Sequence, residues 1–142
     1  MTTHREARLI SASVDRVFDL VADVERYPEF LPLWRHARVY RREGDVYHTE
    51  QEIGVGPIRE RFRTRTELRR PARIDVASDD ALFRAFHIGW TFDPVQSGCR
   101  ASIALTWEVR SRSLQSAIDL LLPTVARTMV DAFQRRAGEV AR

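Results

Sequence analysis

The stretch that most constrains the fold is residues 111–137, which predict one long amphipathic helix. Large apolar residues recur there at spacings of three and four, which places them on one helical face: Leu114, Ile118, Leu121, Leu122, Val125, Met129 and Phe133. Ser111 or Ser113 can cap its start, Gly138 is expected to end it, and Pro123 is expected to kink or split it. Such a stripe requires a large apolar partner, so the rest of the chain is predicted to form a curved sheet that receives it.

The residues before this helix predict strands and two short helices. Residues 6–11 predict a first strand, and Ser13 can cap a helix that runs to Asp23. Residues 23–34 contain two prolines among aromatic side chains, which favours a short second helix or turn. Six further stretches have the pattern of strands between short turns: 37–42, 46–53, 58–68, 73–77, 82–92 and 101–109. The expected fold is α+β, a seven-stranded antiparallel sheet wrapped around the long C-terminal helix, with a pocket where the two do not meet.

Composition bounds the class of protein and its location. A chain of 142 residues, 44% of them hydrophobic, is expected to form one domain over residues 1–142 with a substantial core. It has no run of 18 apolar residues, and its polar first ten residues predict no signal peptide. The one cysteine, Cys99, has no partner for a disulfide within the chain. Together these features favour a cytoplasmic location.

The charges suggest two alternative partners. All 23 basic residues are arginine and the net charge is +3, which permits contact with RNA or with an anionic membrane surface. Charges of both signs alternate along most of the chain, however, which favours an ordinary solvated surface. Four arginines share the outer face of one predicted strand: Arg59, Arg61, Arg63 and Arg65. An RNA-binding strand would benefit from an aromatic neighbour, but Phe62 points to the other face, so a solvated strand face is favoured over a ribosomal contact.

Several motifs resemble those of a known superfamily. The run VADVERYPEFLPLW at residues 21–34 is followed by Phe83, Trp90 and Phe92, by WEVRS at 107–111 and by MVDAFQRRA at 129–137. This set resembles the START-like superfamily with the helix-grip fold. More narrowly, it resembles the polyketide cyclase/dehydrase branch, which includes the coenzyme Q-binding proteins and the ribosome-association toxin RatA family. The resemblance covers about residues 4–138.

The resemblance implies a cavity between the sheet and the C-terminal helix that holds a lipid-like or polycyclic molecule. In the coenzyme Q group this ligand is a quinone with a polyisoprenoid tail, which is carried and not transformed. The RatA group implies binding to the large ribosomal subunit and a block of subunit joining. The aromatase/cyclases of the branch imply a cavity that shapes a polyketide chain. A non-enzymatic carrier of a quinone, polyisoprenoid or other lipid-like ligand is the favoured hypothesis, and the other two roles are kept as alternatives.

Candidate site residues follow from strand parity and from the apolar stripe of the helix. The predicted ligand-binding wall is apolar: Phe62, Phe86, Trp90, Phe92, Leu105, Trp107, Ile118, Leu121, Val125 and Met129. The alternative is that these side chains only pack a core. Gln51, Glu60 and Arg84 are expected to point inward, where Glu60 and Arg84 could pair or bind a ligand oxygen, unless they reach water at the strand ends.

The sequence assigns no catalytic residue, cofactor motif or metal site. Glu60 is the one candidate for a general acid or base, and only if it lies beside a ligand. His36 and His48 lie on neighbouring predicted strands without the spacing of a zinc site. The oligomeric state is left open.

Overall fold

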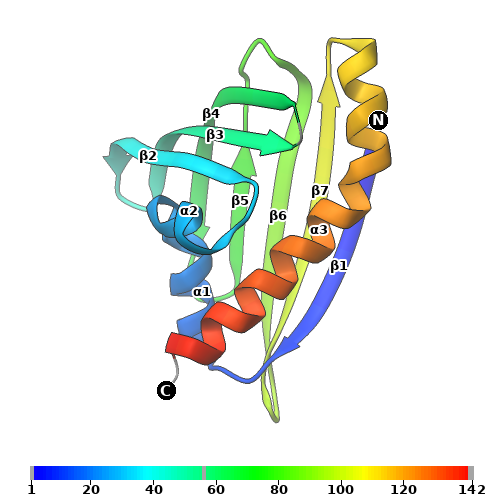
Figure 1. Ribbon diagram of the computed structural model, residues 1–142. Coiled ribbons are helices and arrows are strands. Elements are labelled where there is room, and N and C mark those ends of the chain that lie inside the picture. The colour runs from blue at the N-terminus through cyan, green and yellow to red at the C-terminus, as the bar shows by residue number, and fades with distance from the viewer. Residues whose placement is uncertain (1, 56, 141–142) are drawn as a thin grey trace.

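The computed structural model describes residues 2–55 and 57–140 of the chain. Its elements follow in chain order: β1 (Thr2–Ile10), α1 (Val14–Ala22), the 3-10 turn η1 (Val24–Arg26), α2 (Tyr27–Phe30), β2 (Trp34–Glu43), β3 (Val46–Val55), β4 (Ile58–Arg69), β5 (Arg73–Ala77), β6 (Phe83–Val95), β7 (Gly98–Val109) and α3 (Arg112–Val140). Figure 1 shows α3 crossing one side of a strongly curved sheet, with α1 and α2 between β2 and the C-terminal end of α3.

All seven strands form one antiparallel sheet, in the order β1-β7-β6-β5-β4-β3-β2. From β2 to β7, each strand pairs with the next one in the sequence, as the short turns between them require. β1 completes the sheet by pairing with β7, from Thr2 opposite Trp107 to Ile10 opposite Cys99. The predicted α+β helix-grip architecture is therefore confirmed.

Several strands begin or end beyond their predicted bounds, and β1 and β6 show the reason. β1 begins at Thr2 and not at residue 6, because β7 offers a hydrogen-bonding partner along the whole segment. β6 continues to Val95, beyond its predicted end at Phe92, because Val95 pairs directly with Gly98. In both cases the pairing partner, which local patterning does not reveal, extends the strand.

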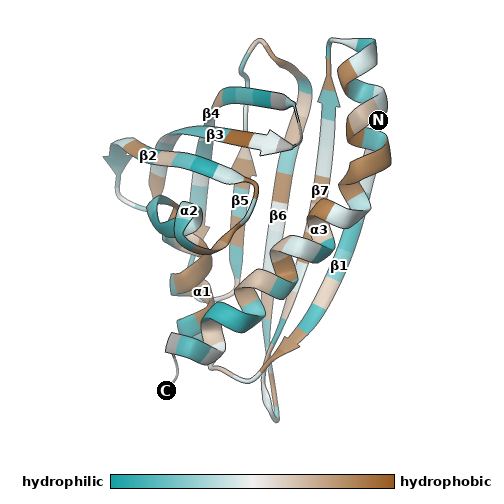
Figure 2. Cartoon of the chain, viewed as in Figure 1, coloured by the Kyte–Doolittle hydropathy of each residue, from teal (hydrophilic) through white to brown (hydrophobic). Residues whose placement is uncertain are grey.

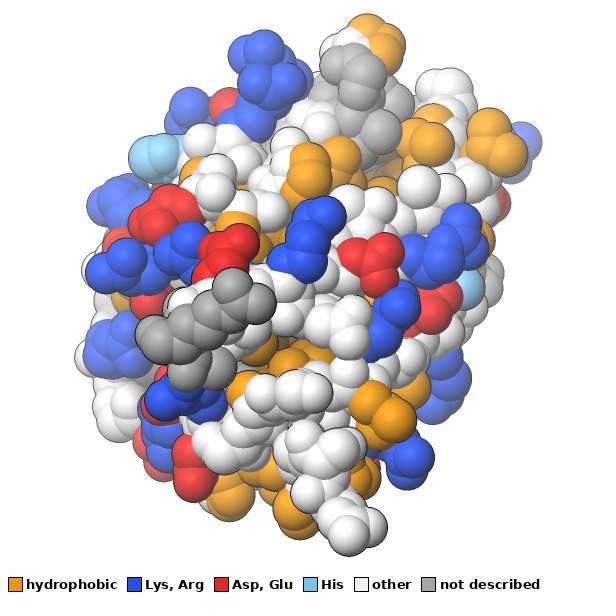
Figure 3. Space-filling model, turned by 60° about the horizontal axis from the view of Figure 1, so that its bottom comes forward, with side chains coloured by type: hydrophobic (Ala, Val, Ile, Leu, Met, Phe, Trp, Pro, Cys, Tyr) orange, Lys and Arg blue, Asp and Glu red, His pale blue; other side chains and the backbone are white. Residues whose placement is uncertain are grey.

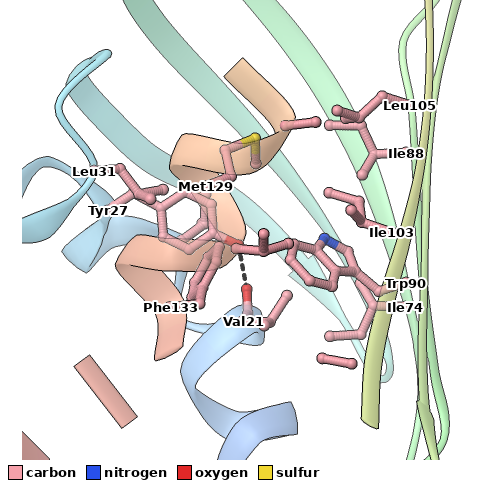
Figure 4. Packing of buried hydrophobic residues seen from close by; sticks show 14 of the residues in the cluster. Val21, Tyr27, Leu31, Ile74, Ile88, Trp90, Ile103, Leu105, Met129 and Phe133 are labelled. Atoms are coloured by element: carbon pink, nitrogen blue, oxygen red, sulfur yellow. Dashed lines mark hydrogen bonds between the residues drawn. The ribbon is translucent and has the colours of Figure 1, made fainter. Parts of the chain in front are cut away.

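The inner face of the sheet carries the apolar parity of each strand. On β7 the alternate residues Ala101, Ile103, Leu105, Trp107 and Val109 are all buried, as predicted. Figure 4 shows Ile74, Ile88, Trp90, Ile103 and Leu105 of the sheet facing Met129 and Phe133 of α3. On the outer side, teal bands along β2 and β4 in Figure 2 mark their polar residues. The core thus lies between the sheet and the second half of α3.

The C-terminal helix α3 is one continuous element. Its start is capped by Ser111, whose Oγ accepts a hydrogen bond from the Leu114 N–H at 3.3 Å. Pro123 lies inside the helix without splitting it, and Figure 1 shows α3 changing direction from along β7 to a diagonal path over the sheet. The expected end at Gly138 is wrong, since α3 runs to Val140. Ala137 is fully buried, and this packing holds the last turn in place despite the low helix propensity of glycine.

Helix α1 matches its prediction. The Ser13 side chain caps its start by accepting a hydrogen bond from the Arg16 N–H at 3.2 Å, and Val17, Phe18 and Val21 bury its apolar face. Within the described part of the chain, no helix is long and apolar enough to cross a membrane.

Candidate functional site

An apolar pocket lies beneath the first half of α3. It is bounded by α3 and by strands β3, β4, β6 and β7, and its described lining consists of Ile53, Glu60, Phe62, Leu82, Phe83, Phe86, Trp107, Val109, Leu114, Ala117, Ile118, Leu121, Leu122 and Val125. We call this space the outer pocket. Its volume is about 50 Å³, so it is a narrow cleft that admits a slim apolar group without rearrangement.

The outer pocket exists because the sheet covers only part of the apolar stripe of α3. Leu114, Ile118 and Leu121, in the first half of the helix, stay partly exposed. Met129 and Phe133, in the second half, are buried against the sheet and α2. A single periodic stripe in the sequence is therefore divided by the fold into a pocket wall and a core.

A second, inner cavity of about 30 Å³ lies deeper in the molecule, and Phe62 and Phe86 line both spaces. The centroids of these two rings are 5.5 Å apart, so together they form a partition between the outer pocket and the inner cavity. The inner cavity is also lined by Tyr47, Gln51 and Thr66. Rotation of the two phenylalanine rings would join the spaces into one longer cavity.

The predicted wall residues divide between these spaces. Six of them line the outer pocket: Phe62, Phe86, Trp107, Ile118, Leu121 and Val125. Four line the inner cavity: Phe62, Phe86, Trp90 and Met129. Phe92 and Leu105 are fully buried and line neither space, so the structure places them in the core. Whether the lining residues bind a ligand stays a prediction.

The three predicted polar residues have different positions. Gln51 is buried and faces the inner cavity, as expected. Glu60 is partly exposed in the wall of the outer pocket. Arg84 is exposed, so its inward orientation was predicted wrongly: a bulge between Phe83 and Ala85 turns Phe83 inward in its place. In the described part of the chain, no ion pair joins Glu60 to Arg84.

Gln51 belongs to a buried polar cluster whose side chains hydrogen-bond to one another. Its side-chain oxygen accepts a hydrogen bond from Trp34 Nε1 at 2.7 Å, and its amide donates to Thr49 Oγ1 at 2.9 Å and to Thr64 Oγ1 at 3.3 Å. Sequence analysis did not identify Thr64 and Thr66 as buried polar residues, although both follow the same strand parity as Phe62. Because these groups pair with one another, they stabilise the cavity wall and are not free to bind a ligand.

The Trp107 side chain offers an unused hydrogen-bond donor. The residue is buried and lines the outer pocket, and its indole Nε1 has no hydrogen-bond partner among the described residues. Its ring stacks on Phe86, with centroids 5.6 Å apart and planes at 14°. An unpaired buried N–H is destabilising by about 1–3 kcal/mol.

Two tyrosines hold the C-terminal end of α1. The Tyr27 hydroxyl donates to the Val21 carbonyl, drawn as a dashed line in Figure 4, and the Tyr47 hydroxyl donates to the Ala22 carbonyl at 2.8 Å. Carbonyls in the last turn of a helix lack partners within the helix, and these hydroxyls supply them. Burial raises the pKa of Tyr27 well above its usual value and raises the pKa of Tyr47 to about 12.

We expect the stability of the protein to fall between about pH 10 and pH 12. Below pH 10 both states keep the tyrosine protons, so these groups cause no change with pH. Above pH 10 the unfolded chain loses the Tyr47 proton while the folded chain keeps it, which lowers the unfolding free energy by about 1.4 kcal/mol per pH unit. Urea unfolding at stepped pH measures this slope. Tyr47→Phe should make the slope shallower, and an unchanged slope in Tyr47→Phe would contradict the prediction.

The outer face of β4 carries the predicted arginine stripe. Arg59, Arg61, Arg63 and Arg65 are all exposed there, as strand parity indicated. Arg61 Nε donates to Glu52 at 2.9 Å, and looser ion pairs at 3.7–3.9 Å join Arg61 and Arg63 to Glu50. Figure 3 shows basic and acidic side chains interspersed over the face that it presents. The stripe thus belongs to a mixed but arginine-rich surface.

Comparison with known proteins places the chain in a family. A profile of the family described as polyketide cyclase/dehydrase and lipid transport matches residues 10–134. The chain belongs to this family. The ribosome association toxin RatA of Pseudomonas aeruginosa is 31% identical to this family member over 142 residues, with 99% of both chains covered. The branch that the motifs suggested is therefore confirmed.

Two more distant similarities complete the comparison. The mitochondrial coenzyme Q-binding protein COQ10 homolog B of Xenopus laevis is 26% identical over 142 residues, which cover 96% of this chain and 58% of that protein. The crystal structure of the Zhui aromatase/cyclase from Streptomyces sp. R1128 superposes with a TM-score of 0.89 over 99% of this chain and 96% of the other, at 11% identity. The second similarity concerns the fold alone.

Proposed function

We propose that this family member binds a hydrophobic small molecule, of the quinone, polyisoprenoid or other lipid-like class, in the outer pocket. The observation that carries the proposal is the apolar cleft left open between the sheet and the first half of α3. Family membership and the coenzyme Q-binding relative support the same type of ligand. Affinity would come mainly from burial of apolar area, at about 0.8 kcal/mol per methylene group before the costs of association.

The shape of the site favours a slender apolar ligand. The outer pocket is narrow, so a chain or a flat ring enters it more easily than a bulky polycycle. A longer chain could pass between Phe62 and Phe86 into the inner cavity when these rings rotate.

The direct test is native mass spectrometry with lipid extraction on protein purified from its own host. The proposal predicts a bound mass that matches an extracted quinone, prenyl lipid or other lipid-like molecule. Protein that is empty from the host, and that also fails to take up added short-chain quinones or prenols, would contradict it. Leu121→Lys and its control, described in the Discussion, connect any bound mass to the outer pocket.

Association with the large ribosomal subunit is the second candidate function. It is favoured by the 31% identity to a ribosome association toxin along nearly the whole chain. Such a role would place the chain in the cytoplasm. Sedimentation with purified ribosomal subunits at low and high salt tests it: the protein should pellet with the large subunit, and absence from that pellet at low salt would exclude the role.

A further inference from the structure

One polar cluster on the outer face of the sheet is independent of the pocket. It joins three strands and consists of Arg38 and Tyr40 on β2, Glu50 on β3, and Arg61 and Arg63 on β4; we call it the Tyr40 cluster. Arg38 lies directly opposite Glu50, and Glu50 lies directly opposite Arg63, so these three side chains form one row across the sheet. Strand parity on β4 alone does not show this row, because it depends on pairing between strands.

The charge of the Tyr40 cluster is unbalanced. Glu50 accepts loose ion pairs from three guanidinium groups: Arg38 at 3.9 Å, Arg61 at 3.7 Å and Arg63 at 3.9 Å. Glu52 also pairs with Arg61, at 2.9 Å. Two carboxylates therefore face three arginines, and the long contacts to Glu50 leave guanidinium donors available to another anion. Exposed ion pairs of this type contribute little to stability, so a phosphate could replace them at low cost.

Tyr40 gives the cluster an aromatic surface. It is 41% exposed, an unusual position for a large ring, and the guanidinium carbons of Arg63 and Arg38 lie 5.4 Å and 5.9 Å from its ring centroid. The His48 ring lies 6.2 Å away on the same face. Sequence analysis did not identify this ring, although Tyr40 follows the strand parity of Arg38 and shares its outer face.

We propose that the Tyr40 cluster binds single-stranded RNA, with a base stacked on Tyr40 and phosphates held by Arg38, Arg61 and Arg63. An exposed ring on a sheet surface flanked by arginines is the arrangement by which proteins hold unpaired bases and the adjacent backbone. An anionic membrane fits less well, because this face presents a single large exposed apolar side chain, Tyr40, for insertion into lipid. The other large exposed apolar residues of the described chain lie elsewhere, Leu9 on β1 and Leu120 on α3. The choice of RNA rests on the second candidate function, ribosome association.

Fluorescence anisotropy with a labelled oligouridylate of about 12 nucleotides tests the proposal. Tyr40→Ala should weaken binding by about ten-fold, while Tyr40→Phe, which keeps the ring, should bind as the unmodified protein does. The double variant Arg38→Glu with Arg63→Glu should make the plot of log affinity against log salt concentration shallower by about 1.4, since two phosphate contacts are lost. The matched control, Arg5→Glu with Arg100→Glu, makes the same change of net charge at exposed positions on β1 and β7 and should retain most of the affinity.

Three results would overturn the proposal. The first is equal RNA binding by Tyr40→Ala and Tyr40→Phe. The second is an equal loss in the control double variant, which would indicate only a net-charge effect. The third is tighter binding to phosphatidylglycerol vesicles than to RNA with no dependence on Tyr40, which would identify a membrane as the partner.

Sedimentation with ribosomal subunits separates this proposal from the function on which it rests. If the protein pellets with the large subunit and Tyr40→Ala pellets equally well without loss of RNA affinity, ribosome association stands and the Tyr40 cluster is not the contact. If the protein does not pellet but binds RNA through Tyr40, the RNA site stands and ribosome association fails.

Discussion

Phe133→Ala is expected to lower the unfolding free energy by about 3–5 kcal/mol, a large share of the stability of a domain of this size. Phe133 is 1% exposed and lies where the second half of α3 meets α2 and the sheet. Its ring contacts Tyr27, Phe30 and Trp90 edge-on, with centroids 5.4, 5.2 and 5.2 Å away. Figure 4 shows Phe133 between Tyr27 and Trp90. Truncation would leave a cavity bounded by three aromatic rings, which cannot readily collapse into it.

The matched control for Phe133→Ala is Ile118→Ala, at a position on the same apolar stripe but in the wall of the outer pocket. Ile118 is partly exposed, so its truncation should lower the unfolding free energy by at most about 1.5 kcal/mol. Urea unfolding followed by circular dichroism measures both variants. Equal losses at the two positions would show that the first half of α3 is packed as tightly as the second, and would contradict the division of the stripe into pocket wall and core.

Leu121→Lys is expected to weaken binding of a neutral apolar ligand by at least about ten-fold while the fold is retained. Leu121 lines the outer pocket but is partly exposed, so a lysine there can reach water when the pocket is empty. A bound ligand would cover the ammonium group and remove it from water, and that desolvation opposes binding. Quenching of tryptophan fluorescence by a short-chain quinone measures the affinity, since Trp107 lies in the pocket wall.

The neighbouring residue supplies the control for Leu121→Lys. Leu120 is 79% exposed on the same turn of α3, so Leu120→Lys makes the same chemical change outside the pocket and should bind the quinone as the unmodified protein does. Equal affinity in both variants would exclude the outer pocket as the binding site. If Leu121→Lys lowers the melting temperature, the quinone affinities of the uncharged variants Leu121→Gln and Leu120→Gln are compared in its place.

Local patterning predicted most of the secondary structure. The 3.6-residue period of α3, the caps at Ser13 and Ser111, and the alternation along β7 are each encoded within a few neighbouring residues. Antiparallel pairing of consecutive strands followed from the short turns, and the motifs around residues 21–34 and 129–137 indicated the family. Gly138 was predicted to end α3 because glycine is a common helix stop, but the helix continues to Val140. Burial of the neighbouring Ala137 stabilises this last turn.

The candidate site depended on contacts between segments that lie far apart in the sequence. Which apolar side chains form a pocket and which form a core was decided by how far the sheet covers α3, and periodicity is the same in both halves of that helix. The bulge beside Phe83 reversed the facing of single residues and turned Arg84 outward, while pairing across β2, β3 and β4 brought Tyr40 beside the arginines of β4. The sequence by itself determined the elements and their apolar faces because these are local properties. Only the tertiary structure decided the pocket, its partition and the Tyr40 cluster, because strand register and sheet curvature set which distant residues meet.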